Sequence, residues 1–98
     1  MRLWRISNHL DLSGDGGFIV EGRWHRRGIG VVYATDHPAT AMLETLAHFD
    51  VRRIPDDYQL LGIDVPSDAP QHRLDPTVLP SGWRNNLELT QSLGMELL

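Results

Sequence analysis

The sequence predicts a small domain of the α+β class, or of a mixed α/β class, extending over residues 1–98 as a single unit. One observation is that several short segments have the composition of β-strands. A second is that one central segment has the apolar periodicity of an α-helix. A third is that strands and helix do not alternate in a regular βαβ order, which argues against a doubly wound parallel sheet.

The N-terminal third predicts three strands. Residues 2–6 are short and rich in apolar side chains, and residues 18–20 form a second, shorter candidate. Between them, residues 12–17 contain three glycines and are expected to form a loop. Residues 28–35 have a β-branched and aromatic centre and give the clearest strand prediction of the chain.

The segment 39–49 is predicted to form an amphipathic helix. Asp36 or His37 is placed to cap its start, and Pro38 fits the first turn, where a missing N–H has no consequence. Apolar residues recur at intervals of three and four, which predicts one buried face. The expected buried face consists of Ala39, Met42, Leu43, Leu46 and Ala47.

The second half of the chain is less regular. Residues 58–65 predict a further strand, and residues 66–83 hold four prolines and predict a surface connection. Residues 84–98 have only weak helical character.

The composition excludes several kinds of chemistry. The chain has no cysteine, so it has no disulfide, no thiolate metal site and no thiol nucleophile. All nine basic residues are arginine, which excludes a catalytic lysine. The net charge is −4, so the overall field does not attract nucleic acid or anionic lipid. No stretch approaches the roughly 20 apolar residues of a membrane span, and the expected location is the cytoplasm.

Glu44 is the most informative carboxylate. On a helix over 39–49 it lies at the border of the expected buried face, with His48 one turn later on the same side. One interpretation is a solvated helix edge with an i,i+4 polar pair. The other is a carboxylate held at the rim of a cleft beside the preceding strand.

Three further side chains are candidates for a binding site. Arg5 and Arg23 each neighbour a tryptophan in an apolar context, where a guanidinium needs an anionic partner. That partner is either a carboxylate of the protein or a phosphate of a ligand. Tyr33 lies in the centre of the predicted strand 28–35 and is either a core residue or a ring that lines a pocket.

Metal and nucleotide motifs do not fit. The loop that starts at Asp11 imitates an EF-hand but has Gly22 where the pattern requires glutamate. His37, Glu44 and His48 do not match a zinc-hydrolase motif, although a small metal- or anion-binding module using them is one alternative. Residues 28–30 lack the third glycine of a dinucleotide fingerprint.

Several of these segments together resemble one known family. The order W-R-I at 4–6, E-G-R-W-H-x-x-G at 21–28, V-V-Y-A-T at 31–35 and A-x-x-M-L-E-T-L-A-H at 39–48 resembles the RES-domain toxins of bacterial Xre–RES toxin–antitoxin pairs. The likeness covers residues 3–50 well. It continues more loosely through P-x-G-W-R at 80–84 and T-x-x-L-G at 90–94.

The resemblance implies a fold related to the ADP-ribosyltransferases and cleavage of the nicotinamide–ribose bond of NAD. The outcome is hydrolysis, phosphorolysis or transfer of ADP-ribose to a protein. It implies that Arg5, Tyr33 and Glu44 are catalytic and that these three residues and Arg23 bind NAD, without a metal. It also implies an Xre-type helix-turn-helix antitoxin as partner.

The family's serine follows the T-x-x-L-G stretch, where this chain stops, so we expect the segment that carries it to be absent. We assign its role to neither Ser81 nor Ser92. A second interpretation is therefore a catalytically impaired domain that only binds an antitoxin. Missing strands would expose edges and apolar surface, which favours association with itself or with a partner.

Overall fold

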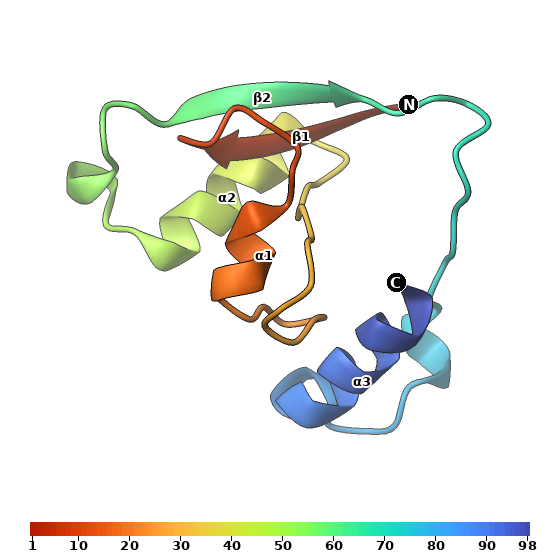
Figure 1. The fold of residues 1–98 in the computed structure, drawn as a ribbon. Helices are drawn as coiled ribbons and strands as arrows, with labels where there is room; N and C mark the ends of the chain where they lie inside the picture. Colours follow the sequence, from red (N-terminus) through yellow and green to blue (C-terminus); the bar gives the residue numbers. More distant parts are fainter. The chain divides into compact units, whose positions relative to one another are not determined.

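The computed structural model describes residues 1–98, apart from the side chain of Val51. The described chain contains two strands, three α-helices and three short 3-10 helices (Figure 1). In chain order they are β1 (Arg2–Ser7), α1 (Asp15–Ile19), α2 (Pro38–His48), η1 (Val51–Arg53), β2 (Gln59–Asp64), η2 (Pro76–Val78), η3 (Trp83–Asn85) and α3 (Leu87–Leu97). The fold is therefore of the α+β class, as predicted.

Contacts between residues divide the chain into two compact units. Unit 1 consists of Met1–Leu12 and Tyr33–Ala69, and unit 2 consists of Ser13–Val32 and Pro70–Leu98. Unit 1 holds both strands and α2, whereas unit 2 holds α1 and α3. None of the helices in the described part of the chain has the length and apolar character needed to cross a membrane.

The sheet of unit 1 is a pair of antiparallel strands. β1 and β2 pair over their whole length, from Arg2 opposite Asp64 to Ser7 opposite Gln59. Both strands were predicted from composition, and both are confirmed within one residue of the expected boundaries. The Arg2 Nε donates to Asp64 Oδ1 at 2.8 Å, which adds an exposed ion pair at one end of the sheet.

The helix of unit 1 follows the predicted course. Pro38 occupies the first turn of α2, and extended His37 precedes it as the N-cap residue without a side-chain cap. The helix ends at His48, and the extended backbone of Phe49 terminates it. α2 packs against β1, and Figure 1 shows the helix lying along the strand pair.

The buried face of α2 differs from the expected one. Ala41 and Thr45 are buried, and the Thr45 hydroxyl donates to the Ala41 carbonyl at 2.9 Å. Leu43 is 67% exposed, and the other members of the expected face (Ala39, Met42, Leu46 and Ala47) are also exposed. The prediction of this face was wrong because the 3.6-residue period identifies an apolar stripe, but not the stripe that another element covers. Here β1 packs against the smaller side chains.

The strand predicted over residues 28–35 does not form. The segment is irregular, and only Thr35 pairs as an isolated bridge with Trp4, through reciprocal main-chain hydrogen bonds of 2.7 and 2.8 Å. Gly28 has a φ of 101°, which a strand does not accommodate. The β-branched composition was overridden because the main-chain N–H of Val31 bonds to the Gly14 carbonyl in a loop rather than to a strand.

The strand predicted over residues 18–20 is also wrong, because Phe18 and Ile19 belong to the single-turn helix α1. Gly14 begins this helix with a left-handed φ of 75°. Asp15 lies in the first turn, where a carboxylate interacts favourably with the helix dipole. Gly17 packs against the Ile29 carbonyl so closely that a side chain could not be accommodated. The glycines therefore determine the structure of this segment.

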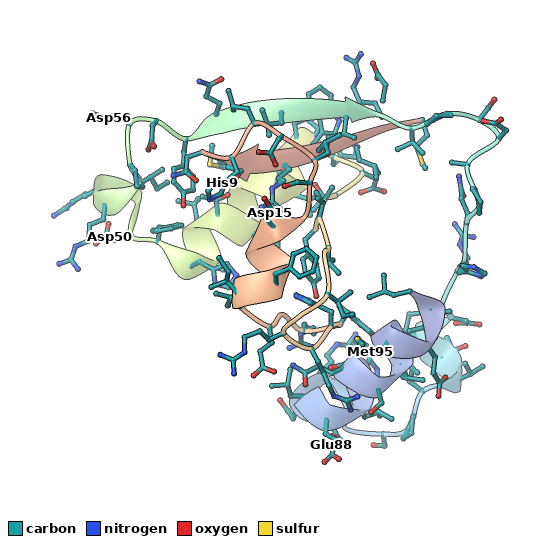
Figure 2. All side chains as sticks on the ribbon, in the orientation of Figure 1. His9, Asp15, Asp50, Asp56, Glu88 and Met95 are labelled. Carbon is teal, nitrogen blue, oxygen red and sulfur yellow. The ribbon has the colours of Figure 1, made fainter. Side chains whose placement is uncertain are left out.

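The C-terminal helix of unit 2 is confirmed and is better defined than the sequence suggested. The Asn86 side chain caps α3 by accepting from the Leu89 N–H at 3.1 Å. Glu88 points outward into solvent from the first turn (Figure 2). The opposite side is buried and unusually polar, since it consists of Thr90, Gln91 and Gly94. This polar face determines how unit 2 is held together.

Candidate functional site

The four predicted site residues are divided between the two units. Arg5, Tyr33 and Glu44 belong to unit 1, and Arg23 belongs to unit 2. In unit 1 they come from β1, from the irregular segment before α2 and from α2 itself.

Arg5 lies on β1 opposite Leu61 and is half-buried. Its Nη1 donates to the main-chain carbonyl of Tyr33 at 3.0 Å. The sequence predicts an anionic partner, whereas the partner in this structure is a neutral carbonyl. A guanidinium has five N–H donors, so this bond fixes the side chain while leaving further donors for an anion.

Tyr33 precedes the Thr35–Trp4 bridge by two residues, so the same part of β1 that carries Arg5 also holds this segment. Its side chain is 39% exposed. The ring is therefore neither a fully buried core residue nor part of a regular strand. A partly exposed aromatic ring anchored through its main chain is suited to stacking on a planar ligand.

Glu44 is exposed on α2, between the buried positions Ala41 and Thr45. At about 100° per residue it lies about 80° from the centre of the face that packs on β1. Among the described residues, its carboxylate has no hydrogen-bond or ion-pair partner, and the expected pair with His48 is not formed. The structure thus shows a hydrogen bond between Arg5 and the Tyr33 main chain. Glu44 does not take part in this contact, although its helix α2 packs against β1, the strand that carries Arg5.

Arg23 was expected in a buried, apolar context, but the structure exposes it. Its main-chain carbonyl accepts a hydrogen bond of 2.6 Å from the buried Thr90 hydroxyl. Within the described part of the chain, the guanidinium itself has no ion-pair or hydrogen-bond partner. A hydrogen bond therefore holds the main chain of Arg23, while its guanidinium is available to bind an anion.

Local hydrogen bonds shift the pKa values of two exposed carboxylates, Asp64 and Asp75. The hydrogen bond and charge of Arg2 hold the pKa of Asp64 below its ordinary value and raise the pKa of Arg2 in turn. In η2, hydrogen bonds from the Thr77 N–H and hydroxyl lower the pKa of Asp75. Both effects support local structure rather than proton transfer.

The surface of unit 2 has a hollow that lies apart from the predicted site residues. An open hollow of about 580 Å³ lies in unit 2, lined by Ile19, Val20, Glu21, Arg26, Arg27 and Gln91. It includes none of the four predicted residues. Among the residues that the structure describes, no three histidine, aspartate or glutamate side chains are grouped to hold a metal ion, so His37, Glu44 and His48 do not form such a cluster.

Sequence reasoning missed the residues that hold the segment around Arg23. Thr90, Gln91 and His25 are buried polar side chains that bond to the main chain of this segment. Thr90 and Gly94 are part of the T-x-x-L-G stretch noted in the sequence, which was the signal that could have found them. Their pairing joins positions nearly 70 residues apart, so no local pattern revealed it.

The RES domain family matches residues 2–98 of the chain. A protein from Pseudomonas putida named "Toxin Res" is 46% identical over 100 residues, which cover 100% of this chain and 68% of that protein. A "Prs ADP-ribosylating toxin" from Sphingobium is 38% identical over 88 residues, or 82% of this chain and 55% of that protein.

A second "Toxin Res", from Photorhabdus laumondii, is 35% identical over 85 residues, covering 87% of this chain and 53% of that protein. The chain thus spans between about half and about two thirds of the length of these relatives.

Proposed function

We propose that this chain, which belongs to the RES domain family, acts as a toxin that breaks the nicotinamide–ribose bond of NAD. The observation that carries the proposal is the 38% identity to a relative named as an ADP-ribosylating toxin. ADP-ribosylation consumes NAD, and it begins with the loss of nicotinamide from the ribose. The names of the other relatives support the toxin part of the proposal.

Arg5 and Arg23 are proposed to bind the pyrophosphate or ribose of NAD. Charge-assisted hydrogen bonds from guanidinium to phosphate are among the stronger polar contacts in proteins. The single hydrogen bond of Arg5 to the Tyr33 carbonyl orients it without neutralising its charge. The exposed guanidinium of Arg23 is equally available. The chain has no lysine, so arginine is its only strongly basic side chain.

Tyr33 and Glu44 are proposed to act on the reacting end of NAD. The ring of Tyr33 stacks on nicotinamide, and the carboxylate of Glu44 binds a ribose hydroxyl. When the C1′–N bond breaks, its electron pair leaves with nicotinamide and the ribose becomes a cation. The negative charge of Glu44 stabilises this cation, as carboxylates do in glycoside cleavage. No protein partner has to be displaced from Glu44 first.

The acceptor oxygen then forms a bond to C1′ and releases its proton. Water, phosphate and a protein side chain are three acceptors that balance this step. The name of the Sphingobium relative favours transfer to a protein. Product analysis separates the three, because hydrolysis gives free ADP-ribose, phosphorolysis gives a phosphorylated ADP-ribose, and transfer gives a labelled protein.

The test is nicotinamide release from NAD by the purified chain. We expect release by the wild-type chain and loss of at least 100-fold in rate for Glu44→Ala, as is common for groups that stabilise a transition-state charge. Glu96→Ala is the matched control, because Glu96 is an exposed helical glutamate in unit 2. No release by a folded wild-type chain at high concentration, or an unchanged rate for Glu44→Ala, would contradict the proposal.

The toxin names also support an antitoxin partner, and we propose an Xre-type helix-turn-helix protein acting in the cytoplasm. In the alternative proposal the chain only binds this partner and does not cleave NAD. Co-expression of the chain with an Xre-type helix-turn-helix protein, expected from a neighbouring gene, should give a stable complex by size-exclusion chromatography. Self-association of the chain alone would be seen in the same experiment. Separate elution of the two proteins would contradict the pairing.

A further inference from the structure

We propose that α3 is a clamp for the loop Gly22–His25 and that Thr90 and Gln91 are positioning residues for Arg23. This inference rests on the proposed role of Arg23 in binding NAD. The clamp and the loop belong to the same unit, so all the contacts involved lie within unit 2.

Two neighbouring carbonyls of the loop accept hydrogen bonds from buried side chains of α3. The Thr90 Oγ1 donates to the Arg23 carbonyl at 2.6 Å, and the Gln91 Nε2 donates to the Gly22 carbonyl at 3.0 Å. Thr90 is 1% exposed and Gln91 is 6% exposed, so water does not compete readily for these bonds. The Gln91 amide also donates to the Glu21 carboxylate at 3.0 Å, just before the loop.

The third carbonyl in succession, that of Trp24, lies against the main chain of Gly94. A side chain on Gly94 would overlap this carbonyl, so α3 can approach the loop only because the residue is glycine. The Trp24 ring also packs at 6.0 Å from the ring of Trp83, in the short helix that precedes α3. Three successive carbonyls of the loop therefore rest on one helix face.

His25 closes the loop on its other side. The Gly22 N–H donates to the His25 Nδ1 at 3.2 Å and approaches the His25 carbonyl at 3.3 Å. Because Nδ1 accepts, the ring proton is on Nε2, which lies 3.3 Å from the Gly17 carbonyl and donates to it. The loop is thus fixed to itself and to α1, and Arg23 lies inside it.

These contacts hold the main chain of Arg23 in place, whereas its guanidinium makes no hydrogen bond within the described part of the chain. Arg26 is different, since its Nη2 donates to Ser92 at 2.8 Å. Among the described residues, the Arg23 guanidinium has no such bond. A cation on a fixed main chain loses less conformational freedom when it binds an anion than one on a mobile loop. Thr90 and Gln91 therefore affect the binding of NAD by positioning Arg23, and not by contacting NAD themselves.

The first experiment replaces Thr90 by valine, which keeps the shape and removes the donor. Arg23 binds NAD before and during bond cleavage, so its displacement should raise KM and leave kcat unchanged. We expect KM for NAD to rise about tenfold in Thr90→Val, because a loosened main chain makes Arg23 lose more conformational freedom when it binds NAD. kcat should stay within about twofold. Thr90→Ser should restore KM, because serine supplies the same hydroxyl.

Ser92→Ala is the matched control. It removes one hydroxyl from the same helix, but that hydroxyl bonds to Arg26 and not to the loop. Gln91→Met is the second test variant and should also raise KM, so a failure of Thr90→Val to fold leaves the inference testable. Wild-type KM in folded Thr90→Val or Gln91→Met overturns it.

A double-mutant cycle separates positioning from general loss of structure. In an Arg23→Ala background, Thr90→Val should cause no further rise in KM, because the residue that it positions is gone. A further tenfold rise in that background overturns the inference, since Thr90 would then act by another route.

Amide hydrogen exchange tests the clamp independently of NAD. Thr90→Val should speed exchange at Gly22–His25 and leave β1 and β2 unchanged. If the wild-type chain releases no nicotinamide, the proposed function fails, and the clamp is decided by this exchange alone. Unchanged exchange at Gly22–His25 in Thr90→Val overturns the clamp, whether or not NAD is consumed.

Discussion

The interactions that stabilise the inside of unit 1 differ from those inside unit 2. In unit 1, main-chain hydrogen bonds join β1 to β2, and α2 packs on β1. In unit 2, buried polar side chains bond to loop carbonyls, and glycines allow main chains to touch. Among the described residues, Ala41 is the only apolar one that is nearly fully buried, whereas Thr90, Gln91 and His25 are buried and polar. A small fold can thus depend on polar contacts as much as on an apolar core.

The largest expected effect lies in unit 2, at Gly94. An added side chain would overlap the Trp24 carbonyl, so Gly94→Ala must separate α3 from the loop. We expect a loss of roughly 3 kcal/mol in the free energy of unfolding, at the upper end for overpacking. Urea denaturation measures it.

Gly16→Ala is the control for Gly94→Ala, because nothing outside the local helix backbone lies within 4 Å of the added carbon. Gly16 is also in a helix and does not have a positive φ. Its replacement should be neutral or stabilising by about 0.5 kcal/mol. Equal stability of the two variants would show that unit 2 does not depend on the contact between α3 and Trp24.

The next effect tests which face of α2 is covered in unit 1. Ala41 is 4% exposed on the packed face, and Leu43 is 67% exposed. Ala41→Leu overfills this face and should cost roughly 1–3 kcal/mol. Leu43→Gln should change stability by less than about 0.5 kcal/mol. A larger loss of stability for Leu43→Gln than for Ala41→Leu in thermal unfolding would support the buried face that the sequence predicted.

The smallest effect is at the exposed ion pair of unit 1. Arg2 lowers the pKa of Asp64, so the folded carboxylate holds its proton less tightly than the unfolded one. The pair therefore stabilises the fold above the ordinary aspartate pKa, and this contribution is lost as the pH falls through the lowered value. Asp64→Asn should lower Tm slightly at neutral pH and low salt, and not at high salt. A decrease in Tm that does not depend on salt would show that the ion pair with Arg2 is not the cause.

The regular parts of the fold could be predicted from the sequence. The segments 2–6 and 58–65 form the sheet, and 39–49 forms the helix, because their patterns are local. The segments 18–20 and 28–35 could not be predicted correctly, since β-branched residues there are overruled by the turns at Gly14 and Gly28. Composition records propensity, whereas these turns depend on contacts with distant main chain.

The sequence predicts the members of the candidate site and not their contacts. Motif resemblance selected Arg5, Arg23, Tyr33 and Glu44, but it did not foresee that Arg5 bonds to a Tyr33 carbonyl or that Arg23 is exposed. It also missed Thr90, whose hydroxyl meets a carbonyl 67 residues earlier in the chain. Such pairings arise from the tertiary fold, and no periodicity encodes them.

We propose that Glu44 stabilises the reacting ribose and that Arg23 binds NAD. The most direct test is steady-state nicotinamide release by Glu44→Gln and Arg23→Ala, each verified as folded. We expect Glu44→Gln to lower kcat at least 100-fold, and Arg23→Ala to raise KM at least tenfold with kcat within about threefold. An unchanged kcat in Glu44→Gln, or a loss confined to kcat in Arg23→Ala, would contradict the claim.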